Sequence, residues 1–193
     1  MARTPVFVIT GPSGAGKGTL EQKLLRRFPD VLELAVSATT RPRRPAEEHG
    51  VHYWFLVPEE FDRSVAAGEL LEWVEFAGNR YGTLRAEIDA IRDRGRAPLL
   101  DLEIEGAKRV RDRVDGSVVI FVDAPLGELE RRLRERATES SGEIGERLEI
   151  ARRQREHRDA FDYVVENHDL GAAVSELVAI VERELSAATI PGR

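Results

Sequence analysis

The sequence contains no cysteine, only four histidines, and only three lysines among its 29 basic residues. The missing cysteines exclude disulfides, thiolate catalysis and cysteine-bound metals, and the few histidines lack metal-ligand spacing. No apolar run approaches the roughly 18 residues that cross a membrane. The residues after Met1 lead directly into a strand-like run, not a signal peptide. We therefore predict a cytoplasmic protein.

Positive charge is also scarce overall, since 35 acidic residues outweigh the basic ones and give a net charge of −6. An acidic chain without a basic arm argues against general binding to nucleic acid or to an anionic membrane. A hydrophobic fraction of 41% over 193 residues is enough for one folded domain. Any anion that this protein binds must be held by a few positive charges gathered locally.

Strand-like and helix-like segments alternate along most of the chain. Apolar runs of strand length occupy residues 6–10, 98–104, 117–122 and 163–166, and an amphipathic helical pattern at 174–185 closes the chain. Such alternation predicts an α/β fold with a mostly parallel sheet flanked by helices.

Two segments interrupt this alternation. Residues 37–81 are rich in proline, glycine and aromatic residues, which predicts a small insert beside the main sheet. A highly charged helical stretch at 128–159 contains the small, polar sequence A-T-E-S-S-G-E-I-G at 137–145. Two glycines within that sequence predict a mobile tip.

A glycine-rich sequence, G-P-S-G-A-G-K-G, follows the first strand and opens the first helix, which is the context of a phosphate-binding loop. Glycines allow backbone N–H groups to turn toward phosphate oxygens, and the helix N-terminus adds a positive dipole. A plain glycine-rich turn is the alternative that this context disfavours. The predicted nucleotide-binding residues are Gly11, Pro12, Ser13, Gly14, Ala15, Gly16, Lys17, Gly18 and Thr19.

Lys17 is expected to reach the β- and γ-phosphates of the nucleotide. The strict pattern has serine or threonine directly after this lysine, whereas here Gly18 precedes Thr19. No residue is therefore directly assigned to the metal, and the Mg²⁺ that accompanies a nucleotide would lie near Thr19.

The insert combines groups suited to phosphate and to a base. Three arginines stand beside prolines at 41–45, where planar guanidinium forks suit bidentate contacts to phosphate. Glu72 and the D-L-E sequence at 101–103 supply carboxylates. A carboxylate can accept from the N1–H and exocyclic amine of guanine together, whereas adenine offers no such donor pair. Sites of this type discriminate by about 10⁴ to 10⁵.

These motifs resemble those of guanylate kinases, in the same order and over nearly the whole chain. They are the phosphate loop, S-x-T-T-R-x-x-R followed by H-G-x-x-Y, E-x-x-x-F-x-G-N-x-Y-G-[ST], and the acidic strand before Gly106. The resemblance implies a P-loop kinase fold that transfers the γ-phosphoryl group of ATP to GMP, and also to dGMP. Its partners would be these small molecules, with Mg²⁺ bound to ATP, and its oligomeric state stays open.

The resemblance also implies roles for single residues. The GMP phosphate would be bound by Ser37, Arg41, Arg44, Tyr53 and Tyr81. Guanine would be recognised by Glu72, Thr83 and Glu103, with Asp101 near the metal and phosphates. Alternation along the chain places Tyr53 and Trp54 on opposite faces, and we favour Tyr53 facing the site and Trp54 packing inward. Glu72 alone would be taken for a surface carboxylate, and Arg43 alone for a solvated charge.

The charged stretch resembles the guanylate kinase lid. Arg132 and Arg136 share one helical face, and Arg147 lies beyond the tip, so the resemblance makes these three arginines catalytic together with Lys17 and Arg44. Arginines over a transferring phosphoryl group contribute about 10³ to 10⁵ in rate. A solvated face with i,i+4 ion pairs is the plain alternative for most of the charges there. Asn167 falls near the adenine by the same resemblance, and is otherwise a turn residue.

We predict three parts. The nucleotide-binding core comprises residues 1–34, 85–128 and 159–193, the GMP-binding insert 35–84, and the lid with its flanking helices 129–158. Departures from the family pattern occur at Arg43, Ala46, Arg80, Glu105 and Ala137. Two alternatives stay open: a non-enzymatic module of this fold that binds a protein partner, and a kinase for another small phosphorylated acceptor.

Overall fold

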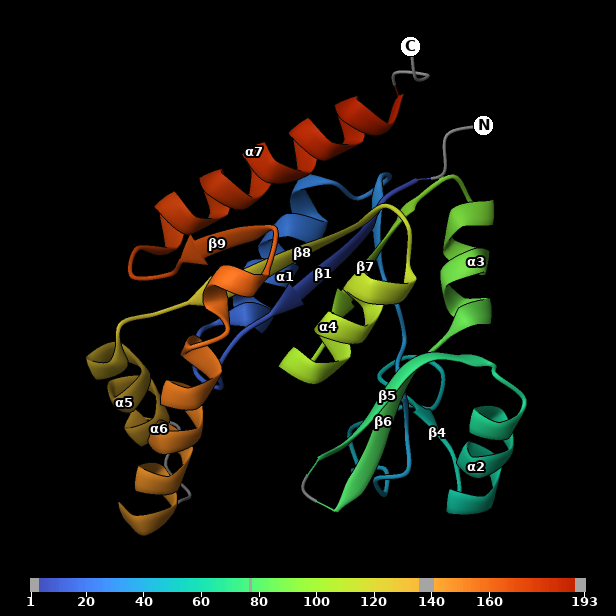
Figure 1. The fold of residues 1–193 in the computed structure, drawn as a ribbon, viewed down its shortest axis with the longest axis horizontal. Helices are drawn as coiled ribbons and strands as arrows, with labels where there is room; N and C mark the ends of the chain where they lie inside the picture. The colour runs from blue at the N-terminus through green and yellow to red at the C-terminus, as the bar shows by residue number, and fades with distance from the viewer. Residues whose placement is uncertain (1–3, 77, 136–140, 190–193) are drawn as a thin grey trace.

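A five-stranded sheet, parallel throughout, forms the centre of the computed structural model, which describes residues 4–76, 78–135 and 141–189 (Figure 1). Its order is β2-β7-β1-β8-β9. Its strands are β1 (Val6–Thr10), β2 (Leu32–Leu34), β7 (Ala97–Asp101), β8 (Ser117–Asp123) and β9 (Tyr163–Glu166). The α/β fold and four of these strands confirm the sequence prediction, whereas the three-residue β2 was missed.

Helices cover both faces of this sheet because its strands are apolar on both sides. Phe7 and Ile9 pack in one cluster with α1 and α7, while Val6 and Val8 pack in a second cluster with α3 and α4. Neighbouring residues of a strand point to opposite faces, so one buried run serves both clusters. The helices are α1 (Lys17–Arg27), α3 (Arg85–Asp93), α4 (Ile104–Arg113) and α7 (Leu170–Thr189).

A second sheet lies beside the carboxyl ends of the central strands, at the lower right of Figure 1. Its order is β4-β3-β6-β5, and a small cluster of Ala38, Phe61 and Leu70 packs between the sheet and α2. Trp54 packs against this cluster, as alternation predicted. The elements are β3 (Ala38–Thr39), β4 (Trp54–Phe55), α2 (Pro58–Ala66), β5 (Leu70–Phe76) and β6 (Asn79–Leu84).

The charged stretch forms two helices, α5 (Leu126–Glu135) and α6 (Ser141–Arg155), followed by the short helix η1 (Arg158–Ala160). They project at the lower left of Figure 1, on the same side of the central sheet as the small sheet. Residues 141–145 of the predicted mobile tip belong to the start of α6, and residues 137–140 lie outside the described part of the chain, so the predicted mobility stays a prediction. None of the described helices is long and apolar enough to cross a membrane.

Candidate active site

The glycine-rich loop joins β1 to α1 and depends on its glycines. Gly11, Gly14 and Gly16 have φ angles of 137°, 86° and 90°, which disfavour residues with a Cβ. A Cβ at Gly11 would also lie only 2.1 Å from the carbonyl oxygen of Val122. Lys17 Nζ donates to the Gly11 carbonyl oxygen at 2.8 Å, so its ammonium folds back over the loop. The loop therefore needs glycine both because its φ angles are positive and because a side chain at Gly11 would clash with the neighbouring strand.

Asn167 follows β9 and supports this loop. Its side-chain amide donates to the Ala15 carbonyl oxygen at 2.7 Å, and a Cβ at Gly16 would lie 2.4 Å from the same nitrogen. Asn167 is buried, and its Oδ1 is without a hydrogen-bond partner among the described residues. Asn167 therefore lies directly beside the loop, and its predicted role near the nucleotide stays a prediction.

Arg132 of α5 is docked on the loop. Its guanidinium donates to the carbonyl oxygens of Ala15 at 3.2 Å and Asn167 at 2.9 Å, and pairs with Glu128 at 2.9 Å. Two of the predicted lid arginines thus have different surroundings in this structure: Arg132 touches the loop, whereas Arg147 is exposed on α6. Arg136 lies outside the described residues.

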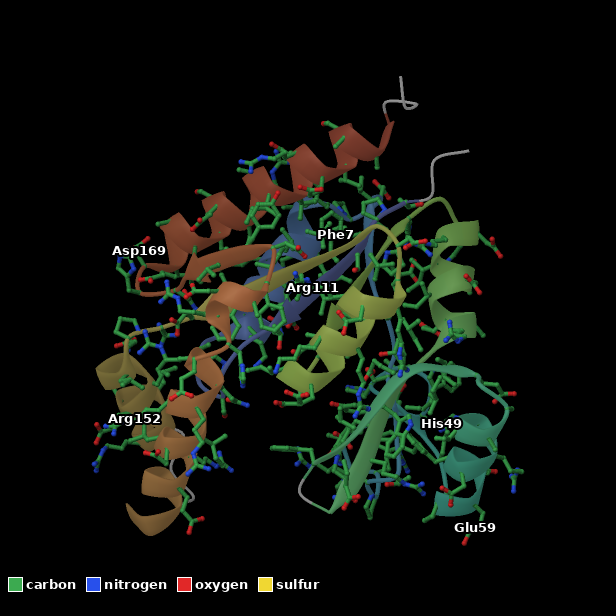
Figure 2. All side chains as sticks on the ribbon, in the orientation of Figure 1. Phe7, His49, Glu59, Arg111, Arg152 and Asp169 are labelled. Atoms are coloured by element: carbon green, nitrogen blue, oxygen red, sulfur yellow. The ribbon has the colours of Figure 1, made fainter. Side chains whose placement is uncertain are left out.

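A cavity of about 240 Å³ opens between the central sheet and the small sheet. Figure 2 draws the side chains of both parts, with Phe7 labelled on the central sheet and His49 beside the small sheet. Most of the predicted acceptor residues meet here with the loop lysine. The cavity is lined by Lys17, Ser37, Tyr53, Glu72, Tyr81, Asp101 and Glu103, together with apolar Val74, Phe76 and Leu102 and with Gly82.

A β-bulge aims Glu72 at this cavity. Leu70 pairs with Leu84 and Glu72 with Thr83, so β5 carries one residue more than β6 between these pairs. The extra residue, Leu71, packs in the cluster that α3 and α4 form with the central sheet, while Leu70 packs in the small cluster beside α2. A bulge re-aims the side chains that follow it. Glu72 therefore lies opposite Thr83, whose hydroxyl donates to Glu72 Oε1 at 2.8 Å.

Glu72 is only 2% exposed. Burial raises the pKa of its carboxyl group, and the Thr83 hydrogen bond and the Arg109 charge oppose that rise. A buried carboxylate is costly unless it is well hydrogen-bonded, so a ligand that donates to Glu72 would recover part of that cost. Thr83 is thus placed to orient Glu72. The predicted position of Glu103 is different: it does not end a strand, because β7 ends at Asp101 and Glu103 is the N-cap of α4.

Arg41, one of the predicted phosphate-binding residues, is held in place by other residues of the insert and lies beside Tyr53 of the cavity lining. Arg41 forms a bidentate pair with Glu47, at 2.7 and 3.1 Å, and its guanidinium lies 5.4 Å from the Tyr53 ring centre. Arg41 lowers the pKa of Glu47 to about 2. Tyr53 and Tyr81 lie edge to face beside them, with ring centres 6.1 Å apart. Arg44 is exposed, and its backbone N–H donates to Glu47 at 2.8 Å.

Two sequence departures lie outside this cavity lining. Arg80 pairs with Asp62, donates to the Pro58 carbonyl oxygen at 2.9 Å and lies over the Phe61 ring. Arg43 is exposed and donates to the Glu47 carbonyl oxygen, in agreement with its interpretation as a surface charge. Arg80 therefore stabilises the contact between α2 and β6.

Carboxylates gather around Lys17. Desolvation in the cavity raises the pKa of Asp101, and the Lys17 charge opposes this rise. The pKa of Glu103 is raised by burial and by Asp101 and lowered by Lys17. Gln154 of α6 lies 3.5 Å from Glu103, so the lid helix approaches the same cluster. A phosphate that entered the cavity would be attracted by the Lys17 ammonium and repelled by these carboxylates. A cation bound with the phosphate would offset this repulsion.

A third carboxylate near Lys17, that of Glu21, was not predicted from the sequence. Glu21 lies on α1 and is 7% exposed, and its Oε1 is without a partner among the described residues. Burial, reinforced by Asp101 and opposed by Lys17, raises its pKa to about 8. The available signal was a charged residue directly beside the apolar stripe of Leu20 and Leu24. At neutral pH this group is mainly protonated.

We expect Glu21→Gln to stabilise the protein above pH 8 and to flatten its pH dependence. The folded pKa is raised from 4.5 to about 8, so wild-type stability falls as pH rises through this window. The full effect is on the order of 5 kcal/mol. Urea unfolding at pH 5, 7 and 9 measures it, with exposed Glu176→Gln on α7 as the control for one lost charge. Parallel curves for wild type and Glu21→Gln would contradict the prediction.

The parallel sheet, the glycine-rich loop and the adjoining polar cavity define a P-loop nucleotide-binding protein with an acceptor pocket. A family model described as guanylate kinase matches residues 3–184. The chain belongs to the guanylate kinase family.

Individual relatives agree with this assignment. A guanylate kinase of Synechococcus sp. (strain JA-3-3Ab) is 46% identical over 180 residues, covering 93% of this chain and 82% of that protein. A guanylate kinase of Desulfitobacterium hafniense (strain Y51) is 44% identical over 180 residues, covering 93% and 90%. The crystal structure of guanylate kinase from Anaplasma phagocytophilum superposes with a TM-score of 0.74 at 28% identity, covering 96% of this chain and 88% of that one.

Proposed function

We propose that this protein transfers the γ-phosphoryl group of ATP to GMP or dGMP, giving ADP and GDP or dGDP. The observation that carries the proposal is one cavity lined both by the loop lysine, Lys17, and by Glu72, a buried carboxylate held by Thr83. The first group suits a nucleotide phosphate and the second suits the paired donors of guanine. We further propose that this reaction serves guanine nucleotide metabolism in the cytoplasm.

In this reaction the protein positions two substrates and neutralises charge. The glycine-rich loop and Asn167 hold ATP, Glu72 orients the guanine, and Arg41 with Tyr53 and Tyr81 binds the acceptor phosphate. Lys17 lies between them and offsets the charge of the transferring group. Positioning and electrostatics supply most of phosphoryl-transfer catalysis, so no covalent enzyme intermediate is needed.

Mg²⁺ fits the oxygen donors beside the loop. Asp101 presents carboxylate oxygens at the end of β7, and Thr19 adds a hydroxyl in the first turn of α1, while Gly18 provides no hydroxyl. Such oxygen donors are what Mg²⁺ prefers, together with the phosphates of its nucleotide. The ion would supply further neutralisation of phosphate charge.

Closure would complete the site. The predicted lid arginines, Arg136 and Arg147, and Arg44 of the insert would approach the phosphates when α5, α6 and the small sheet move toward the core. Closure of this kind excludes the water that would otherwise accept the phosphoryl group. Arg132 already contacts the loop from the lid side.

A coupled assay of ADP formation with GMP, dGMP, AMP, CMP and UMP tests the function. We expect kcat/KM for GMP and dGMP to exceed that for AMP by at least about 10³, because AMP would leave the Glu72 carboxylate without its donor pair. Faster turnover with AMP than with GMP would refute the base assignment. No turnover with any acceptor would favour the non-enzymatic alternative.

A further inference from the structure

Gly106 is the third residue of α4 and faces the carboxyl group of Glu72. A Cβ built at Gly106 would lie 2.8 Å from Glu72 Oε2 and 3.4 Å from Glu72 Cδ. Gly106 is buried and is not among the glycines with positive φ, so its backbone would accept any L-residue. The need for glycine at this position therefore comes from the close approach of Glu72, not from backbone conformation.

The Glu72 side chain has little room to yield. Its other oxygen, Oε1, is held by the Thr83 hydroxyl at 2.8 Å. The backbone behind it is enclosed too, because a Cβ at Gly82 would lie 2.9 Å from the Glu72 carbonyl oxygen. Arg109, one turn after Gly106, donates to the carbonyl oxygen of Trp73 and fastens β5 to α4. A side chain at position 106 would thus displace the carboxylate itself.

We propose that Gly106 is a specificity-determining positioning residue. Its missing side chain lets the Glu72 carboxylate lie close against α4, in the position from which it would accept from the N1–H and the exocyclic amine of guanine. A helix of the nucleotide-binding core thereby sets the position of the group that selects the acceptor base. This inference rests on the proposed function, since it concerns recognition of GMP by Glu72.

Gly106→Ala tests the proposal by adding one methyl group. We expect kcat/KM for GMP to fall about tenfold to 100-fold, mainly through KM, because a displaced contact costs this much. The KM for ATP should stay within about twofold of the wild-type value, and kcat/KM for AMP should change little. The ratio of kcat/KM for GMP to that for AMP should therefore become smaller. Gly127→Ala on α5 is the matched control, because a Cβ at Gly127 meets no atom within 4 Å.

A double-mutant cycle with Glu72→Asp separates positioning from general damage to the fold. The shorter aspartate withdraws from Gly106, so we expect Gly106→Ala to have almost no further effect on GMP kinetics in that background. Calorimetric titration with GMP gives a second readout that does not depend on turnover.

The outcomes distinguish the two proposals. If the wild-type enzyme does not prefer GMP, the proposed function fails. If wild type prefers GMP but Gly106→Ala matches Gly127→Ala, only the positioning role fails. The positioning role would also be overturned if Gly106→Ala lowered kcat/KM for GMP equally in the wild-type and Glu72→Asp backgrounds. It would likewise be overturned if Gly106→Ala raised the KM for ATP as much as the KM for GMP.

Discussion

Replacing Lys17 by alanine should reduce kcat at least about 10³-fold while leaving the protein folded. Removal of a single donor from a preorganised site costs about 10² to 10³, and this donor also carries a charge. Lys17 is the cation that opposes the raised pKa values of Asp101 and Glu103 in the cavity. Without it, ATP phosphates would face two carboxylates with less compensation. The fold should survive because the ammonium donates to loop carbonyl oxygens and not to groups of the core.

Lys17→Arg should also lose most activity although it keeps the charge. A guanidinium is a planar fork, whereas the loop encloses a compact ammonium that donates to the carbonyl oxygens of Gly11 and Pro12. Single-turnover rates and thermal melting measure both variants. Lys23→Ala, an exposed lysine on the same helix, is the matched control and should behave as wild type. Near-normal turnover in Lys17→Ala would remove Lys17 from the catalytic assignment.

Local sequence signals were sufficient for four of the five strands of the central sheet and for the phosphate loop. The apolar run of β1 is buried on both faces, so its composition alone marks a central parallel strand. The glycines at 11, 14 and 16 are required by local backbone angles, which a sequence motif records directly. The insert was recognisable from its proline, glycine and aromatic residues, but its strands β3 and β4 are too short to give a clear period.

Contacts between distant residues could not be predicted in this way. Gly106 and Glu72 are far apart in the sequence, and neither is unusual in its own segment. The requirement for glycine at position 106 becomes visible only when α4 packs on β5 and brings Gly106 next to Glu72. Arg132 illustrates the same limit, because its helical spacing fits both a phosphate contact and the observed dock on loop carbonyl oxygens. Glu21 acquires its raised pKa from burial and from Asp101 of another element, which the sequence of α1 alone does not reveal.

Glu72→Gln should lower kcat/KM for GMP about 10³-fold, equivalent to about 4 kcal/mol of transition-state stabilisation. Guanine presents two donors at its N1–H and exocyclic amine. A carboxylate accepts from both, whereas an amide accepts from one and directs its own N–H groups at the other. The amide can still accept from Thr83, so the local structure should persist. Glu75→Gln, at an exposed position on the same strand, should leave the kinetics unchanged.

The same substitution should stabilise the free protein at pH 8, which makes its effects on activity and stability opposite in sign. Burial raises the folded pKa of Glu72, so its contribution to stability falls as pH rises from the unfolded value through the folded one. A neutral amide avoids that loss. Calorimetric melting at pH 4.5, the ordinary pKa of the carboxyl group, and at pH 8 should show a gain for Glu72→Gln that is larger at pH 8. If the variant instead lost stability and activity together, Glu72 would be a structural residue. Higher stability together with lower activity would mean that burying the Glu72 charge destabilises the free protein, and that hydrogen bonds from guanine offset this cost in the complex.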